Sequence, residues 1–295
     1  MNIEKVAINI GAIEKLKEET RSEYLKEIIS LYEKRVHQIF GTIFSPIAIM
    51  NYGMKEAREA KLYLDAISKT NNFGKQNTPK GKKEIETYIR DFQDKNNREL
   101  VNESIKKLKE FQIEYPNITD FLDNNNLNSL VNFWTSFETT LKDVWKVSLN
   151  KNPEKYFHNI TKRVDFSDLP GFSNKTINLG VLAQYNFDIS KSLGDLLSPK
   201  FDFTSIKGIK ISYQSLFTTK NNDLSFMDSE TLNQLEISRH LIVHRAGIID
   251  NDYLRRTKKI GEVLGENIKF STEEYFNMYN ESISATAKLI KALDD

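Results

Sequence analysis

The sequence predicts an all-helical protein, a helical bundle in which an N-terminal helical region precedes a C-terminal domain. Apolar residues recur at three- and four-residue steps along most of the 295-residue chain, which is the period of an amphipathic helix. Glycine and proline are sparse, with 12 and 6 residues, and they fall mainly between the periodic stretches. Hydrophobic residues make up 39% and charged residues 28% of the chain, a balance typical of globular proteins.

The N-terminal part of the chain, residues 1–115, is interpreted as a helical region. Ser45 and Pro46 are residue types preferred at the N-cap and the first helical position, so a helix is expected to start there. Residues 71–83 combine turn residues with four lysines and are expected to form an exposed loop. Pro116 follows a break in the pattern and marks the expected domain boundary. The predicted helices lie near residues 12–40, 46–70 and 82–114.

The second expected domain comprises residues 116–295. An apolar stripe predicts one long helix at 127–149, and a shorter helix is expected at 153–162. The isoleucines and tyrosine between 206 and 213 suggest a weak strand, whereas 179–197 has a helical pattern. The stripe of the long helix consists of Leu127, Leu130, Trp134, Phe137, Leu141, Trp145 and Ser148.

Two helices are predicted at the C-terminal end of the chain, at about 229–249 and 272–293. Ser271 and Glu274 form a capping box, in which the two side chains bond the free amides at the start of the second helix. The apolar residues of the first helix are Leu232, Leu235, Leu241, Ile242 and Ile249. Those of the final helix are Phe276, Tyr279, Ile283, Ala287 and Ile290.

Composition and motifs exclude several classes of function. The chain has no cysteine, which excludes disulfides, thiolate catalysis and cysteine-ligated metal clusters. It also contains no dinucleotide or P-loop glycine pattern, no histidine metal motif and no serine nucleophile elbow. We therefore expect neither a cofactor nor a resident metal ion. Because 42 basic and 41 acidic residues leave a net charge of +1, an anionic partner would be met by a local patch.

The sequence predicts no contact with a membrane. No apolar run approaches the roughly 18 residues needed to span a bilayer. The first residues lack the basic-then-apolar order of a signal peptide. A soluble, cytoplasmic protein is therefore expected.

One segment, residues 239–245, concentrates polar groups within an apolar stretch. It holds two of the four histidines, His240 and His244, and two arginines, Arg239 and Arg245. On a helix His240 and His244 share a face, while Arg239 lies about 140° around the axis from His244. Burying histidine and arginine is costly unless they are paired. Their place among apolar residues therefore indicates either a function or a helix with two histidines at the edge of the core and flanking arginines that serve solubility. The two remaining histidines are isolated and are interpreted as surface or structural residues: His37 and His158.

These side chains suit the cleavage of RNA without a metal ion. An imidazole transfers protons near neutral pH, and a guanidinium holds a phosphate through two parallel hydrogen bonds. Together they fit the attack of a 2′-hydroxyl on the adjacent phosphate. Asp250 and Asp252 partly offset the positive charge that follows the segment. Basic residues that would extend the phosphate contacts are Arg245, Arg255, Arg256, Lys258 and Lys259.

The segment resembles the motif of the HEPN superfamily, the higher-eukaryote and prokaryote nucleotide-binding domains. The hallmark of that family is R-x(4–6)-H, commonly with Asn, Asp or His directly after the arginine. Arg239, His240 and His244 match it, with four residues between Arg239 and His244. The glycine and acidic residue that follow are also similar to the family pattern. The resemblance covers about 229–295, and the predicted helix at 127–149 is compatible with the family's first long helix.

The resemblance implies a helical bundle that acts as a homodimer, in which the motifs of two protomers form a composite active site. It further implies a metal-independent endoribonuclease of toxin, abortive-infection or antiviral defence systems, with RNA as substrate and an antitoxin or trigger protein as a possible partner. Arg239 would orient or stabilise the scissile phosphate, His244 would transfer protons and His240 would support them. The products would carry 2′,3′-cyclic phosphate and 5′-hydroxyl ends.

Two alternatives remain open on the sequence. A non-catalytic HEPN-like module that binds RNA or protein predicts that alanine at Arg239 or His244 leaves the biological effect intact. A helical scaffold in which these residues close a dimer interface predicts loss of the dimer or of stability in the same variants, without an effect on RNA.

Overall fold

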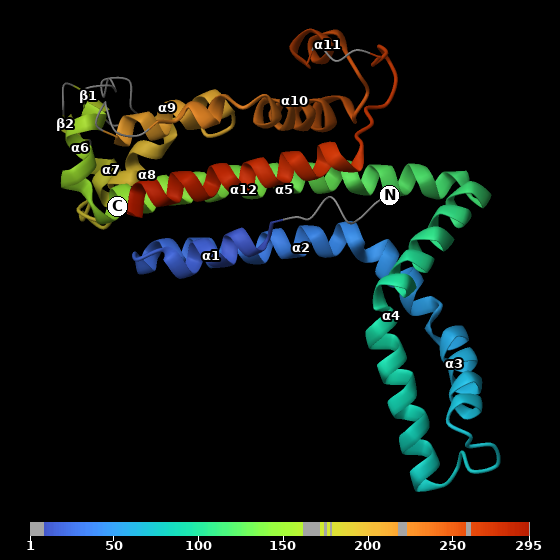
Figure 1. The fold of residues 1–295 in the computed structure, drawn as a ribbon. Helices are drawn as coiled ribbons and strands as arrows, with labels where there is room; N and C mark the ends of the chain where they lie inside the picture. Colours follow the sequence, from blue (N-terminus) through green and yellow to red (C-terminus); the bar gives the residue numbers. More distant parts are fainter. Residues whose placement is uncertain are drawn as a thin grey trace. The chain divides into compact units, whose positions relative to one another are not determined.

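The computed structural model describes residues 9–161, 172–173, 176–177, 179–217, 223–257 and 261–294. Helices dominate this part of the chain, so the predicted all-helical class is confirmed (Figure 1). The only strands there are two short antiparallel segments, β1 (Phe172–Ser173) and β2 (Thr176–Ile177). In the described part of the chain, no helix is long and apolar enough to cross a membrane.

The chain divides into two compact units, and the division differs from the boundary expected near residue 115. One unit contains Met1–Ile39 and Leu127–Asp295, and the other contains Phe40–Asn126. Helices α2 (Glu23–Gly53) and α5 (Pro116–Lys151) each continue through a division point. Pro116 begins α5, where its missing N–H removes no hydrogen bond, so it marks a helix start and no division between units.

The first unit is built on the second half of α5. The apolar stripe predicted for this helix is buried along its whole length, with Trp134, Phe137, Leu141 and Trp145 fully inaccessible. Helix α12 (Thr272–Asp294) lies along α5 in Figure 1, and the ring centroids of Phe133 and Tyr279 are 4.6 Å apart. The unit's other described elements are α1 (Gly11–Glu19), the start of α2, α6 (Pro153–Thr161), β1, β2, α7 (Leu179–Gln184), α8 (Leu193–Leu197), η3 (Ser198–Lys200), α9 (Ile206–Leu216), η4 (Ser225–Asp228), α10 (Glu230–Arg245) and α11 (Asn251–Thr257).

Helix α12 contacts α1 on one side and α10 on another. The predicted capping box at its start is confirmed, since the Ser271 amide donates to the Glu274 carboxylate at 2.7 Å and the Glu274 amide to the Ser271 hydroxyl at 3.2 Å. Tyr279, Ile283 and Ile290 are buried, as their spacing predicted. The last two predicted helices are therefore confirmed as α10 and α12. Helix α10 ends at Arg245, four residues before the predicted end at 249.

The weak strand expected between residues 206 and 213 is wrong, because this segment forms helix α9. The Ser205 hydroxyl accepts a hydrogen bond from the Gly208 amide at 2.9 Å and caps the helix. Ile209 and Tyr213, four residues apart, are buried, whereas Ile211 is 52% exposed. A strand would have placed these three residues on one face, so the burial follows the helical period. The predicted helix at 179–197 is two short helices, α7 and α8.

The second unit contains the end of α2, α3 (Lys55–Lys69), α4 (Pro79–Glu114) and the start of α5. The helix start expected at Ser45 and Pro46 is wrong, because α2 passes through both residues. Pro46 cannot donate a hydrogen bond to the Thr42 carbonyl one turn earlier. The Ser45 hydroxyl donates to that carbonyl at 2.8 Å and the Asn125 amide at 3.3 Å. Side chains thus replace the missing backbone bond and let the helix continue.

The exposed loop expected at 71–83 is shorter than the lysine-rich sequence indicated. Thr78 is the N-cap of α4, and its hydroxyl accepts from the Gly81 amide at 3.1 Å. Pro79 occupies the first turn, where proline is favoured. Three of the four lysines in this segment therefore belong to a helix.

An aspartate at the end of α12 caps the start of α2. Asp294 accepts hydrogen bonds from the Arg21 amide at 2.6 Å and the Ser22 amide at 2.9 Å. Burial raises the pKa of Asp294, but these hydrogen bonds outweigh it and hold the pKa below its ordinary value. The carboxylate therefore stabilises the amide end of α2 in its ionised form.

We expect Asp294→Asn to lower the free energy of unfolding by about 0.5–1 kcal/mol at pH 7, because the side-chain amide lacks the negative charge and has one oxygen acceptor in place of two. Because the folded-state pKa is depressed, this stabilisation is present above the unfolded pKa of roughly 4 and is lost as the pH falls through the folded pKa. Urea unfolding of both proteins at pH 7 and pH 3 measures the difference. A difference that persists unchanged at pH 3 would contradict the assignment to the ionised carboxylate.

Candidate active site

Helix α10 carries the segment that the sequence singled out. Leu232, Leu235, Leu241 and Ile242 are buried, and the helix packs against α12, α9 and η4. These contacts hold one face of α10 in the core and leave the opposite face to solvent.

The two histidines of the segment lie on the exposed face of α10. The imidazole rings of His240 and His244 are 4.5 Å apart between centroids and inclined by 50°. Their shared face is therefore confirmed, but the expectation that the polar groups are buried is wrong for both residues and for Arg245, all of which are exposed. The apolar residues of the segment turn inward at Leu241 and Ile242, so the histidines avoid the cost of burial. Accessible imidazoles suit a large substrate.

Arg239 is half-buried on another side of the same helix. Its Nε atom is buried and has no hydrogen-bond partner, and no carboxylate forms an ion pair with its guanidinium among the described residues. A buried donor without a partner costs about 1–3 kcal/mol, so the Arg239 Nε carries an unmet hydrogen bond in this structure. Helix geometry separates Arg239 from His244 by about 140° around the axis.

The other arginines near the motif each pair with a carboxylate in the structure, and their role in phosphate binding stays a prediction. Arg245 lies 3.4 Å from Asp250, and Arg255 donates a hydrogen bond to Asp252. The bond from Arg255 is the main cause that lowers the pKa of Asp252. Arg256 is paired too, with Glu236 at 3.0 Å. Lys258 and Lys259, also expected in the strip, lie outside the described residues.

Glu236, one turn before His240, is a structural residue. One oxygen of its carboxylate accepts a hydrogen bond from the Ile206 amide at 2.7 Å, at the start of α9. The other oxygen accepts from Arg256 at 3.0 Å, on α11. The carboxylate of Glu236 therefore joins α9, α10 and α11.

The chain leaves α10 through two residues with positive φ. Ala246 has φ 51° and Gly247 has φ 79°, and the Gly247 amide reaches back to the Leu241 carbonyl at 3.4 Å. A Cβ at Gly247 would lie 3.3 Å from Leu127 and 3.4 Å from Ile268, which is a tight fit, and the positive φ disfavours any residue but glycine. This exit orients the end of the motif helix.

Ala246→Gly is expected to raise the free energy of unfolding by about 0.5–1 kcal/mol. Glycine relieves the cost of the left-handed backbone conformation at residue 246, which is roughly 1–2 kcal/mol. It also increases the conformational entropy of the unfolded chain, which offsets part of this gain. Urea unfolding measures the change. As a control, Ala287→Gly within α12 should destabilise by about 1 kcal/mol, because its backbone is helical. Destabilisation by both substitutions would refute the interpretation of the exit.

The described residues contain no cluster of three or more histidine, aspartate or glutamate side chains that could hold a metal ion. His37 and His158 are both exposed, and the His37 ring contacts the Glu33 carbonyl of its own helix at 2.9 Å. These positions agree with the surface interpretation of the two isolated histidines.

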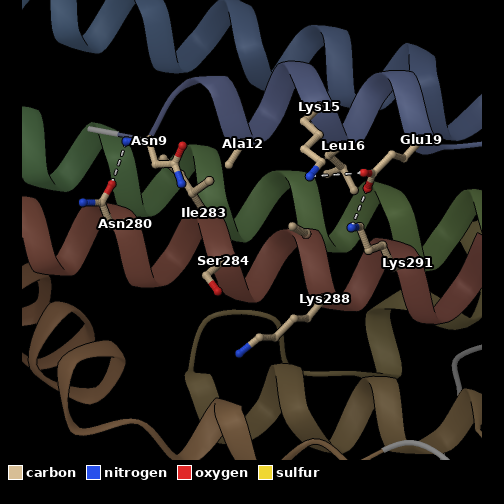
Figure 2. Close-up of a pocket in the computed structure, with 11 residues that line it drawn as sticks. Asn9, Ala12, Lys15, Leu16, Glu19, Asn280, Ile283, Ser284, Lys288 and Lys291 are labelled. Atoms are coloured by element: carbon tan, nitrogen blue, oxygen red, sulfur yellow. Dashed lines mark hydrogen bonds and ion pairs between the residues drawn. The ribbon is translucent and has the colours of Figure 1, made fainter. Parts of the chain in front are cut away.

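One groove that the sequence did not indicate lies away from the motif, between α1 and α12 (Figure 2). Its volume is about 650 Å³, and none of the motif residues lines it. No local signal pointed to it, because the facing residues Glu19 and Lys291 are 272 positions apart in the sequence.

Comparison of the chain with known protein families, with curated proteins and with solved structures found no match. The function is therefore inferred from the residues of α10 and their geometry.

Proposed function

We propose that the chain is a metal-independent endoribonuclease of HEPN type that cleaves RNA as a homodimer. The observation that carries the proposal is the pair of exposed, adjacent imidazoles of His240 and His244, on the same helix as a guanidinium whose buried Nε has no partner, Arg239. Cleavage of RNA needs groups that transfer protons and a cation that stabilises the phosphate, and this helix supplies both.

In the proposed reaction His244 takes the proton of a ribose 2′-hydroxyl while the 2′-oxygen bonds to the adjacent phosphorus. The bond from phosphorus to the 5′-oxygen breaks, and a protonated imidazole of the composite site donates to the leaving oxygen. Arg239 stabilises the negative charge of the phosphoryl oxygens, and His240 supports the neighbouring imidazole. The products are a 2′,3′-cyclic phosphate and a 5′-hydroxyl, and the step consumes no water.

The dimer in this proposal is supported by apolar residues beside the histidines. Val243 is 50% exposed and Ile248 is 47% exposed, and both follow the motif arginine closely. Arg239 and His244 lie about 140° apart around one helix. A second copy of the chain placed over the exposed face of α10 would bring its arginine to the phosphate held beside His244 of the first copy, and its histidine to the phosphate beside Arg239. RNA is the substrate, and an antitoxin or trigger protein would control the enzyme as a toxin or defence effector.

The experiment is incubation of the purified full chain with mixed cellular RNA in excess EDTA, followed by mapping of the product ends. We expect 2′,3′-cyclic phosphate and 5′-hydroxyl ends. An RNA that carries a single 2′-deoxyribose at a mapped cleavage position should remain intact there, because the nucleophile is missing. Cleavage at the deoxyribose, or cleavage that EDTA abolishes, would overturn the proposed chemistry.

A second candidate is a HEPN-like module that binds protein or RNA without cleavage. The exposed apolar residues near the motif favour it, since Val263 and Leu264 are also 52% and 54% exposed. A Val243→Glu variant separates the two candidates when its mass is measured by light scattering. If the chain is the proposed nuclease, the variant is a monomer and no longer cleaves RNA. If the chain is a binding module, the wild type and the variant both bind RNA or a partner, and neither protein cleaves RNA.

A further inference from the structure

The groove between α1 and α12 has an apolar floor. Ala12 and Leu16 contribute to it from α1, and Ile283 contributes from α12 (Figure 2). Ala287 of α12 lines the groove as well. Leu16 and Ile283 are each only 2% exposed, so the floor is continuous with the core of the unit. A volume of about 650 Å³ lies in the range of small-molecule sites, which combine apolar walls with a few polar groups.

One end of this groove holds two ammonium groups around a single carboxylate. Glu19 lies 3.6 Å from Lys15 and 2.7 Å from Lys291. The hydrogen bond from Lys291 is the main cause that lowers the pKa of Glu19, so the carboxylate is ionised. Two positive charges against one negative charge leave a net charge of +1 at this end, which favours an anion.

The remaining lysine of the groove is directed elsewhere. The amino group of Lys288 lies 4.9 Å from the centre of the Phe226 ring, and Figure 2 shows it pointing away from α1. The positive charge inside the groove is therefore confined to the end formed by Lys15 and Lys291.

Glu19 occupies the position that the head group of an acidic ligand would take. Its two ion pairs are largely exposed to solvent, and exposed pairs contribute little to stability. A ligand carboxylate or phosphate can therefore replace Glu19 at the two amino groups at small cost. The apolar floor beside them would cover the body of the same ligand.

We propose that the groove between α1 and α12 binds a small organic anion, with its acidic head at Lys15 and Lys291 and its apolar body along Ala12 and Ala287. A fatty carboxylate and a nucleoside monophosphate share this chemistry. The site is independent of the motif helix, so the inference stands whether or not the chain cleaves RNA.

The test is fluorescence titration of the full chain with 1-anilinonaphthalene-8-sulfonate, which is an aromatic organic anion. We expect Lys291→Gln to raise the Kd at least about fivefold, because a charge-assisted contact is lost. Glu19→Gln should lower the Kd by about two- to fivefold, because it removes the internal competitor of the ligand. The matched control is Lys288→Gln, which should leave the Kd within about twofold of wild type, and circular dichroism checks the folding of each variant.

Competition identifies the natural chemistry. Displacement of the dye by decanoate assigns the site to fatty carboxylates, and displacement by AMP assigns it to nucleotides. The opposite effects of Glu19→Gln and Lys291→Gln are the signature of the site, since general binding of the dye to apolar surface would not respond in this way. Equal affinity of all the variants, or dye that neither competitor displaces, overturns the proposal.

Discussion

The His244→Ala variant is expected to cleave RNA at least about 100-fold more slowly than the wild type, since a positioned general acid or base contributes roughly 10²–10⁴ to the rate. The imidazole is exposed, so its removal leaves the core of the unit intact. Single-turnover rates on one RNA with a mapped cleavage site, measured in EDTA, give the comparison. Light scattering on both proteins establishes that the variant keeps the mass of the wild type.

The matched control for this prediction is His37→Ala. His37 is also an exposed helical histidine of the same unit, and its ring contacts only a carbonyl of its own helix among the bonds described. It should cleave at the wild-type rate. Arg239→Lys adds a second comparison, because lysine keeps the charge but loses the planar fork that holds a phosphate by two bonds. Full activity in both His244→Ala and Arg239→Lys would remove these residues from the reaction and overturn the proposed assignment of the active site.

Trp145→Ala is expected to lower the free energy of unfolding by about 3–5 kcal/mol, the range for removal of a large buried side chain. Trp145 is fully inaccessible, and its ring lies 4.6 Å from that of Phe201 and 5.6 Å from that of Phe203. Its Nε1 donates to the Ser212 carbonyl at 2.9 Å, which ties α5 to α9. Urea unfolding followed by the fluorescence of Trp134 measures the loss.

Two further substitutions separate the parts of this effect. Trp145→Phe keeps most of the volume, and the Ser212 carbonyl still accepts from the Ser215 hydroxyl at 2.6 Å, so we expect a loss of only about 1–2 kcal/mol. Leu179→Ala, at a side chain that is 72% exposed, should change the stability by less than about 0.5 kcal/mol. Similar losses for the alanine and phenylalanine variants would show that volume at Trp145 is not the main contribution.

Elements whose signals are local were predictable from the sequence. The capping box of Ser271 and Glu274 and the stripe centred on Trp134 and Trp145 depend only on near neighbours in the chain. The shared face of His240 and His244 follows from helical spacing in the same way. Each of these features is determined by residues that lie within about two helical turns of one another in the sequence.

Features that depend on distant partners were not predictable. Helix α2 continues through Pro46 because the Ser45 and Asn125 side chains satisfy the carbonyl that proline leaves free, and Asn125 belongs to a remote helix. Residues 206–213 are helical because Ile209 and Tyr213 meet the core, and the Tyr213 hydroxyl bonds the Leu141 carbonyl at 2.7 Å. Short apolar runs fit either period, and burial decides between them.

The candidate site divides in the same way. Residue types and spacing, together with the resemblance to the HEPN motif, selected Arg239, His240 and His244. Their exposure, the pairing of Arg256 with Glu236 and the free Nε of Arg239 required the packing of α10 against its neighbours. The groove of Glu19 and Lys291 required the contact of two helices from opposite ends of the chain. Helical periodicity is a property of adjacent residues, whereas exposure and ion pairing are properties of whichever segments come together in space.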